Sequence, residues 1–276
     1  MKEFLLENRM TTFYNGDCLE VMKELSDNSV DCFICDLPYG CLSIGGKPKV
    51  TEEKAAEYGK GRIQAAGCEW DVKIDLVAFW EQVKRLAKDD HTPVLMFCNT
   101  KFGIDLINSN PSWFRYDLVW DKGRGVSFLL ANKMPMKSHE MIYVFSKKGS
   151  FYRRVDISGN FTAWSAKESN TDKHTNTYSS GMPNGWVDNG NDGTTRCPLS
   201  VIRIGGKSSG GHPTEKPEEL YEWLLRRYVP DRGVVLDPTA GSFNSCFVAD
   251  RLGYTAIGIE KDEAFYEKAV KRLNPE

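Results

Sequence analysis

Short apolar runs alternate with amphipathic stretches along most of the chain. Residues 30–35 are apolar except for Asp31, a pattern typical of a strand buried on both faces of a sheet. In residues 75–87 the apolar side chains recur at helical spacing, which predicts a helix. Similar patterns predict strands over 93–98, 116–120, 140–145, 234–236 and 255–259, and helices over 101–108, 218–228, 242–252 and 262–273. Because strands alternate with helices, we expect an α/β fold with a mostly parallel, doubly wound sheet.

Two stretches interrupt this alternation. Residues 41–70 are polar, contain Gly and Lys, and follow no regular period, so we expect a long surface loop there. Residues 156–200 are rich in Ser, Thr, Asn, Gly and Asp, which predicts a loop-dominated insert. We therefore expect one domain built from two halves, residues 1–155 and 201–276, with the insert 156–200 between them.

The composition is that of an ordinary globular protein. The chain has 276 residues, of which 27% are charged and 41% hydrophobic, and this excludes disordered, collagen-like and coiled-coil proteins. No apolar stretch approaches the roughly 20 residues that a membrane span requires. The N-terminal segment MKEFLLENRM lacks the apolar core of a signal peptide, so we expect a cytoplasmic protein that does not bind membranes. The formal net charge of -2 means that any basic surface must be local.

The eight cysteines are expected to be reduced thiols, because the sequence carries no export signal. Cys32 and Cys35 have the CxxC spacing of metal and redox sites. However, they lie in a predicted buried strand, and no second Cys or Cys/His pair follows at zinc-site spacing. We interpret them as core residues and expect no metal site.

A candidate ligand-binding turn is formed by Leu236-Asp237-Pro238-Thr239-Ala240-Gly241-Ser242. It follows a predicted strand and opens a predicted helix, so backbone N–H groups and the positive end of the helix would face a ligand. Glu260 ends the next strand about 20 residues later, where nucleoside-binding folds carry the acid that binds ribose. This spacing indicates an adenosine-type cofactor. An ordinary strand–turn–helix connection with an exposed Glu is the alternative.

A second candidate site is Asp36-Leu37-Pro38-Tyr39, directly after the first predicted strand. Its carboxylate and a backbone carbonyl could accept hydrogen bonds from an exocyclic amino group, and the ring could stack on a base taken out of its duplex. A strand-terminating turn with a packed Tyr is the alternative.

Several segments together resemble one protein family. Residues 36–39 resemble the Asp/Asn/Ser-x-Pro-Tyr/Phe signature of DNA methyltransferases that act on exocyclic amino groups, and residues 237–242 resemble their S-adenosylmethionine loop. Residues 211–217 are similar to the His-Pro-Thr-Gln-Lys-Pro segment that precedes this loop. Further segments that match are residues 15–18, 118–122 and 139–142. The catalytic signature precedes the cofactor loop, which is the order of the β class of this family.

The resemblance implies a Rossmann-like methyltransferase fold and a reaction that needs no metal. A methyl group would pass directly from S-adenosyl-L-methionine to a base nitrogen. Asp36 would hold the target amino group and stabilise the positive charge that grows on it. A carbonyl of Leu37 or Pro38 would accept the second amino hydrogen, and Tyr39 would stack on the flipped base.

The resemblance also implies a set of cofactor contacts. Asp17 and Cys18 would lie at the adenine, Glu260 at the ribose, and Thr239 within the cofactor loop. The methionine part would be bound by Thr214, Lys216, Asp237, Gly241 and Ser242. For His212, a turn that caps backbone is the alternative to a cofactor contact. The family usually has Gly-Thr-Thr where this chain has Phe243-Asn244-Ser245, and we expect Phe243 either to pack over the cofactor or to narrow its pocket.

The DNA-binding surface is expected to be local. Basic residues outnumber acids between 122 and 154, namely Lys122, Arg124, Lys133, Lys137, Lys147, Lys148, Arg153 and Arg154 against Glu140. We expect the loop 41–70 to close over the DNA or the flipped base. The insert 156–200, with Trp164 and Trp186, would be the target-recognition region.

We therefore predict a site-specific methyltransferase that acts on the N6 of adenine in double-stranded DNA. Asp at the first motif position leans towards adenine in this family, whereas Ser leans towards cytosine. The alternatives are an N4-cytosine enzyme, an enzyme that methylates RNA or protein amides, and a non-catalytic DNA-binding module. A second copy of the chain and a cognate restriction endonuclease are open candidates as partners.

Overall fold

The computed structural model describes residues 2–5, 11–40, 73–126, 128, 131–158, 194–205 and 215–273. The expected loop 41–70 and most of the expected insert lie outside these residues. Contacts between residues divide the chain into two compact units, Met1–Arg153 with Ser200–Glu276, and Arg154–Leu199. Each unit is described by itself.

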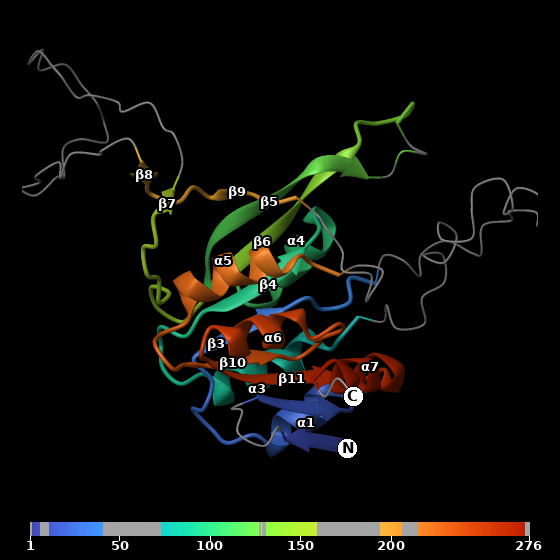
Figure 1. Cartoon of the computed structure of the whole chain (residues 1–276), viewed down its shortest axis with the longest axis vertical. Coiled ribbons are helices and arrows are strands. Elements are labelled where there is room, and N and C mark those ends of the chain that lie inside the picture. The colour runs from blue at the N-terminus through green and yellow to red at the C-terminus, as the bar shows by residue number, and fades with distance from the viewer. Residues whose placement is uncertain are drawn as a thin grey trace, which may run out of the picture. The chain divides into compact units, whose positions relative to one another are not determined.

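The larger unit contains a nine-stranded sheet with the order β1-β2-β11-β10-β3-β4-β6-β5-β9 (Figure 1). Five neighbouring strands from β2 to β4 run parallel, whereas β1 and β6 are antiparallel to their neighbours. The strands are β1 (Lys2–Leu5), β2 (Thr11–Asn15), β3 (Cys32–Cys35), β4 (Val94–Cys98), β5 (Phe114–Val126), β6 (Lys137–Phe145), β9 (Val201–Arg203), β10 (Val234–Asp237) and β11 (Thr255–Glu260). The mostly parallel α/β sheet is therefore confirmed.

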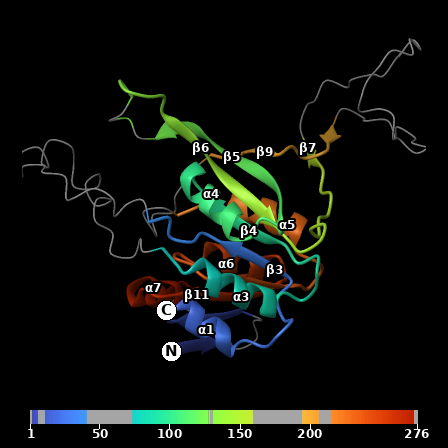
Figure 2. The same cartoon turned by 180° about the vertical axis from the view of Figure 1, so that it is seen from behind.

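Helices cover both faces of this sheet (Figures 1 and 2). They are α1 (Cys18–Glu24), α3 (Leu76–Leu86), α4 (Thr100–Ser109), α5 (Glu218–Tyr228), α6 (Asn244–Arg251) and α7 (Glu263–Leu273). One hydrophobic cluster joins α5, α6 and α7 to the sheet, and a second joins α1, α3 and α4 to it. Strand β3 serves both, because Cys32 and Ile34 belong to the first cluster, and Phe33 and Cys35 to the second. This explains why the strand reads as continuously apolar.

Short polar side chains begin the helices of one face. Asp17 accepts a hydrogen bond from the backbone N–H of Leu19 at 3.0 Å and begins α1. Asp75 begins α3 in the same manner, and Asn99 begins α4 directly after β4. These caps fix where each helix leaves the carboxyl edge of the sheet, which is the edge where ligands bind in such folds.

Strands β5 and β6 continue beyond the sheet as a two-stranded ribbon. Cys98, the last residue of β4, pairs with Met141, so the preceding part of β6 has no partner in β4. The ribbon changes register between Asp121 and Val126, and Gly123 within this irregularity has a φ of 68°. Only its inner half was predicted, because the projecting half is not buried and carries no apolar period.

The smaller unit contains β7 (Ile157–Ser158) and β8 (Thr195–Arg196), which pair antiparallel. Arg154 and Asp156 form an ion pair with N···O distances of 2.5 and 2.9 Å within it. Across both units, no helix among the described residues is long and apolar enough to cross a membrane.

Candidate active site

The candidate residues gather at the carboxyl edge of the parallel strands. Asp36 follows β3, Asp237 ends β10 and Glu260 ends β11. Strands β3 and β10 are neighbours although they lie far apart in the sequence. The chain order reverses between them, and ligands bind at such a switch point in open α/β sheets.

The motif after β3 forms a compact turn. The side chain of Leu37 is 1% exposed and anchors the turn in the core, while Pro38 is half-buried. The Tyr39 hydroxyl donates a hydrogen bond to Asp36 Oδ1 at 3.0 Å. The Tyr39 ring stacks on Phe102 of α4, with centroids 5.3 Å apart and planes 28° apart. The turn thus holds a carboxylate and an aromatic ring in contact.

Lys216 is buried against this carboxylate. Its Nζ donates a hydrogen bond to Asp36 Oδ2 and lies 3.6 Å from Glu140 Oε2 on β6. Glu140 also pairs with Lys122 on β5. The Lys216 ammonium further lies 4.7 Å from the centre of the Phe97 ring. Charges therefore alternate along the row Lys122, Glu140, Lys216 and Asp36.

Neighbouring charges in this row shift the pKa values of Lys216 and Glu140. Burial alone would lower the pKa of Lys216, but the carboxylates of Asp36 and Glu140 outweigh burial and raise it. Burial would raise the pKa of Glu140, but Lys216 and Lys122 outweigh it and lower this pKa. Lys216 and Glu140 are therefore held in their charged forms.

The resemblance assigned Lys216 to a cofactor carboxylate, whereas the structure places its Nζ against two carboxylates of the protein. Sequence reasoning did not identify Glu140 as part of the site. The available signal was a single acid in the otherwise basic sequence 122–154, located in a predicted strand.

Asp237 is a buried carboxylate at the start of the cofactor loop. It is 2% exposed, and burial raises its pKa to about 7. Its Oδ1 accepts a hydrogen bond from the backbone N–H of Thr239 at 3.1 Å, and its Oδ2 accepts one from the Ser245 hydroxyl. A cation placed here would favour the ionised form.

Glu260 ties the loop to the next strand. Its Oε2 accepts a hydrogen bond from the backbone N–H of Gly241 at 2.8 Å, and its Oε1 accepts one from that of Asp262 at 2.7 Å. Asp17 lies at the neighbouring strand end, where it pairs with Lys261 at 3.2 Å. Burial raises the pKa of the adjacent Cys18 to about 12, which keeps it a neutral thiol.

Two features of the loop fit a nucleoside cofactor. The Thr239 hydroxyl oxygen is buried, and it has no hydrogen-bond partner among the described residues. A buried unpaired hydroxyl is costly, so it is expected to bind a polar group of a ligand. Gly241 has a φ of 52°, and among the described residues no atom beyond its two chain neighbours lies within 4 Å of the place where its Cβ would be. Ser242 follows, half-buried.

The expectation for Phe243 is corrected. Its ring is fully buried and lies 4.2 Å from the ring of Phe13, centroid to centroid. Gly258 makes room for it, because a Cβ there would lie 2.7 Å from the Phe243 ring. The ring therefore belongs to the hydrophobic core and does not line the cofactor site.

Asn244 connects the cofactor loop to the segment that carries Lys216. Its Nδ2 donates hydrogen bonds to Glu215 Oε1 at 2.6 Å and to the carbonyl oxygen of Lys216 at 3.2 Å. Its Oδ1 accepts one from Arg272 at 2.6 Å. This side chain is 2% exposed, so the connection is shielded from water. His212 and Thr214, expected upstream, lie outside the described residues.

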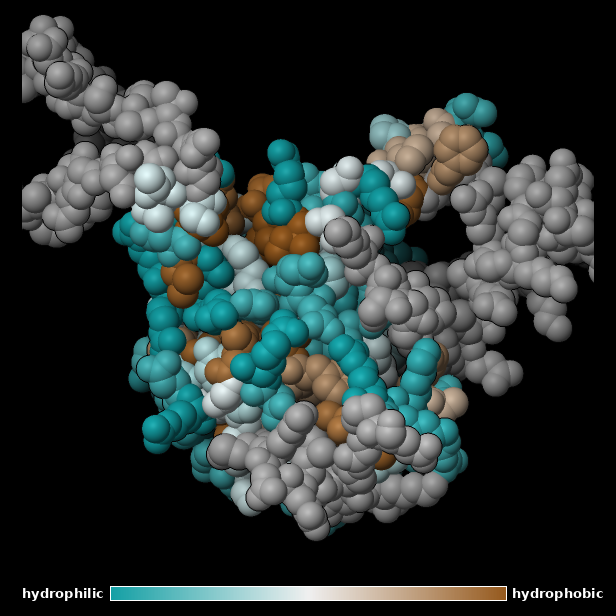
Figure 3. Space-filling view, in the orientation of Figure 1, coloured by the Kyte–Doolittle hydropathy of each residue, from teal (hydrophilic) through white to brown (hydrophobic). Residues whose placement is uncertain are grey.

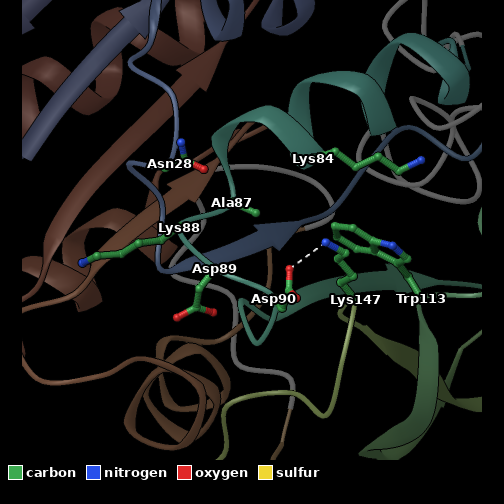
Figure 4. A pocket seen from close by; sticks show the side chains of 8 residues that line it. All are labelled: Asn28, Lys84, Ala87, Lys88, Asp89, Asp90, Trp113 and Lys147. Carbon is green, nitrogen blue, oxygen red and sulfur yellow. Dashed lines mark ion pairs between the residues drawn. The ribbon is translucent and has the colours of Figure 1, made fainter.

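The basic residues expected to form one DNA-binding surface lie at different parts of the sheet. Lys147 and Lys148 both pair with Asp90, at 2.8 and 3.0 Å, and Arg153 pairs with Asp231 at 2.9 Å. A hollow of about 550 Å³ lies beside Lys147 and Asp90 (Figure 4). Its lining residues are Asn28, Lys84, Ala87, Lys88, Asp89, Asp90, Trp113 and Lys147. They flank the amino ends of β3, β4 and β5, so this hollow lies at the edge opposite Asp36.

Comparison with known proteins agrees with this geometry. A DNA methylase family model, that of N6 and N4 methyltransferases, matches residues 30–271. The chain is 27% identical to the type II methyltransferase M.HinfI of Haemophilus influenzae, over 96% of this chain and 68% of the relative. It is 22% identical to M.HindIII of the same species, over 95% of each.

Solved structures share the fold. The M1.HpyAVI–SAM complex superimposes with a TM-score of 0.57 at 17% identity, over 95% of this chain and all of that one. The cytosine-N4-specific PvuII DNA methyltransferase gives a TM-score of 0.61 at 14% identity, over 96% and 88%. The family match spans most of the chain, and the protein therefore belongs to the DNA methylase family that modifies the N6 of adenine or the N4 of cytosine with S-adenosyl-L-methionine as cofactor.

Proposed function

We propose that the protein transfers a methyl group from S-adenosyl-L-methionine to the N6 of adenine in double-stranded DNA, at a specific site and after the base has left the stack. The observation that carries the proposal is the contact of Asp36 with Tyr39 at the strand end beside Asp237. A carboxylate and an aromatic ring for the base then adjoin the cofactor loop.

Asp36 is the group that binds the target nitrogen. Each carboxylate oxygen accepts more than one hydrogen bond, so the bonds from Tyr39 and Lys216 leave capacity for an amino group. The cofactor supplies an electrophilic methyl group when bound. Asp36 stabilises the positive charge on the amino nitrogen and is the nearest acceptor for the proton that this nitrogen releases. A carbonyl of Leu37 or Pro38 accepts the second amino hydrogen.

Tyr39 provides the stacking surface. One face of its ring packs against Phe102, and the opposite face is the one that we assign to the base. Because its hydroxyl is also bonded to Asp36, the ring and the carboxylate are positioned together.

The cofactor is held by the neighbouring strand ends. Glu260 binds the ribose hydroxyls, and Asp17 with Cys18 contacts the adenine. Asp237 faces the ammonium group of the methionine part, and the Thr239 hydroxyl, unpaired among the described residues, finds its partner in the cofactor. Gly241 and Ser242 allow close approach of the backbone.

The target site and the partners extend this proposal. The insert 156–200 reads the recognition sequence. The enzyme works in restriction–modification, as the type II relatives support. Cytosine N4 is the second candidate, favoured by the family match, which includes both reactions.

The test is nucleoside mass spectrometry of DNA from a methylation-free host that expresses the protein. N6-methyladenine, absent when Asp36→Ala is expressed to the same level, supports the proposal. Detection of N4-methylcytosine would change the assigned target base to cytosine and leave the proposed mechanism unchanged. If S-adenosyl-L-methionine raises the melting temperature of the protein but neither methylated nucleoside is found, the proposal that DNA is the substrate is wrong.

A further inference from the structure

The ribbon of β5 and β6 projects from the catalytic edge of the sheet. Strand β5 runs in the same direction as β4, because each is antiparallel to β6. Its end, Val126, therefore lies beyond the carboxyl edge, paired with Lys137. Four residue steps separate Lys137 from Met141, the partner of Cys98, which corresponds to a projection of about 14 Å.

The end of the ribbon exposes large apolar side chains to solvent. Phe128 is 73% exposed and Met134 is 56% exposed, with Val126 and Met136 about two-fifths exposed beside them. In Figure 3 hydrophobic side chains gather at this projecting end, at the upper right. Clusters of this kind mark interaction sites. Phe and Met are also among the side chains that proteins insert between base pairs.

The charge of the ribbon matches a polyanion. The sequence from Lys122 to His139 contains four Lys or Arg residues and no Asp or Glu. Arg124 and Lys133 are exposed, and Lys137 is half-buried. By contrast, the cations at the opposite edge pair with Asp90. An apolar tip flanked by cations is complementary to DNA, with phosphates outside and base faces inside.

The ribbon is connected to the reaction site. Glu140 lies at the inner end of the projecting part of β6, and its carboxylate faces Lys216, the partner of Asp36. At the bend, Gly125 admits Met136, because a Cβ on this glycine would lie 2.5 Å from the Met136 side chain. An irregularity next to a site commonly redirects a strand in this way.

We propose that the apolar side chains at the end of this ribbon, Phe128, Met134 and Met136, form a wedge that enters the DNA beside the target base. A two-stranded ribbon fits the major groove, which is about 12 Å wide. Phe128 and the two methionines press into the base stack and unwind it, while Arg124, Lys133 and Lys137 bind the flanking phosphates. The inference rests on the proposed function only in taking DNA as the partner.

The decisive measurement is DNA unwinding, because it does not require the recognition sequence or turnover. A nicked plasmid is sealed by ligase in the presence of the protein and sinefungin, a non-reactive cofactor analogue, and its linking number is read on a gel. We expect the wild-type protein to lower the linking number in proportion to bound protein. Phe128→Ala should lose at least half of this change. Ile104→Ala removes another exposed apolar side chain, on α4, and should behave as wild type.

Phosphate binding is measured separately. Arg124→Ala and Lys133→Ala should each reduce the slope of log affinity against log salt by about one. Lys84→Ala at the opposite edge should leave the slope unchanged.

Three outcomes overturn the wedge. The first is a wild-type protein that binds the plasmid without unwinding it, and the second is Phe128→Ala that unwinds as wild type does. The third is Phe128→Ala that sediments as a smaller species with unwinding intact, which assigns the tip to contact between copies of the chain. Methylated DNA without unwinding contradicts the wedge alone. Phe128-dependent unwinding without methylated nucleosides contradicts the proposed reaction alone.

Discussion

Lys216 and Asp36, 180 residues apart in the sequence, form a buried ion pair at the carboxyl edge of the sheet. The lysine side chain is 5% exposed, and its second carboxylate, Glu140, lies 3.6 Å away. The carboxylate that we propose to bind the target amino group is thus paired with a cation that comes from the segment just before α5, and not from its own strand.

Replacing this cation should destabilise the fold. Lys216→Met leaves Asp36 and Glu140 near each other without the ammonium, and we expect the free energy of unfolding to fall by about 3 kcal/mol. This is the lower end for a broken buried pair, because both carboxylates are partly exposed. Urea denaturation measures the change. Lys23→Met breaks an exposed pair with Glu20 and should cost less than about 1 kcal/mol. Equal effects of the two variants would contradict the role of the buried pair.

Removing the reacting carboxylate should separate chemistry from cofactor binding. Asp36→Ala should lower methyl transfer by at least about 100-fold, because it removes the group that stabilises charge on the amino nitrogen. Affinity for S-adenosyl-L-methionine, measured by calorimetry, should change less than threefold. Asp105→Ala, which breaks an exposed pair with Lys73, is the control for loss of an aspartate. Near-normal turnover of Asp36→Ala would contradict the proposed role of Asp36 at the target amino group.

The opposite separation is expected at the ribose. Glu260→Ala removes a carboxylate that holds Gly241 in place and accepts the hydroxyls, so the cofactor dissociation constant should rise ten- to a hundredfold, or about 1.5–3 kcal/mol. Calorimetry measures it, with Glu267→Ala on the exposed side of α7 as control. Unchanged affinity would place the ribose elsewhere.

Cofactor affinity should depend on pH through Asp237. Its pKa of about 7 means that most molecules carry a neutral Asp237 at pH 5.5 and half carry the ionised form at pH 7. The cofactor ammonium, whose pKa is near 8, prefers the ionised form. Affinity should therefore rise about tenfold from pH 5.5 to pH 7. In Asp237→Asn the profile should be flat, and a wild-type profile that is also flat would refute the contact.

Stability without cofactor should show the opposite trend. The pKa of Asp237 is higher in the folded protein than its ordinary value of 3.8, so the folded state binds the proton more tightly. Its contribution to stability is complete below about pH 4 and is lost as the pH rises through 7. Melting temperatures of wild type and Asp237→Asn should diverge accordingly.

The sequence predicted the elements in which apolar positions follow a clear pattern. Helix α5 matches its expected range. Strand β4 begins one residue later than expected, and α3 is one residue shorter than expected at each end. Strand β2 and the seven-residue helix α1 were not predicted, because β2 is only partly buried and α1 is too short to repeat a period. Periodicity also does not report strand direction, so the antiparallel β6 was not foreseen.

The sequence motifs located the candidate residues at the strand ends, but they did not reveal which distant side chains contact them. Asp36 and Tyr39 lie close in sequence, and so their proximity was predictable. The contact between Lys216 and Asp36 depends on how α5 packs against the sheet. The orientation of Phe243 depends on the space left by Gly258, which only the packed core reveals.

Asn244 connects the helix that follows the cofactor loop to the segment that carries Lys216, and through Lys216 to Asp36. The Asn244 side chain, at the first residue of α6, donates a hydrogen bond to the backbone carbonyl of Lys216, and the Lys216 ammonium donates one to Asp36. We therefore expect any shift of residues 237–242 on cofactor binding to alter the position of the Asp36 carboxylate. We then expect cofactor and DNA to be thermodynamically coupled ligands, so that each changes the affinity for the other by the same factor.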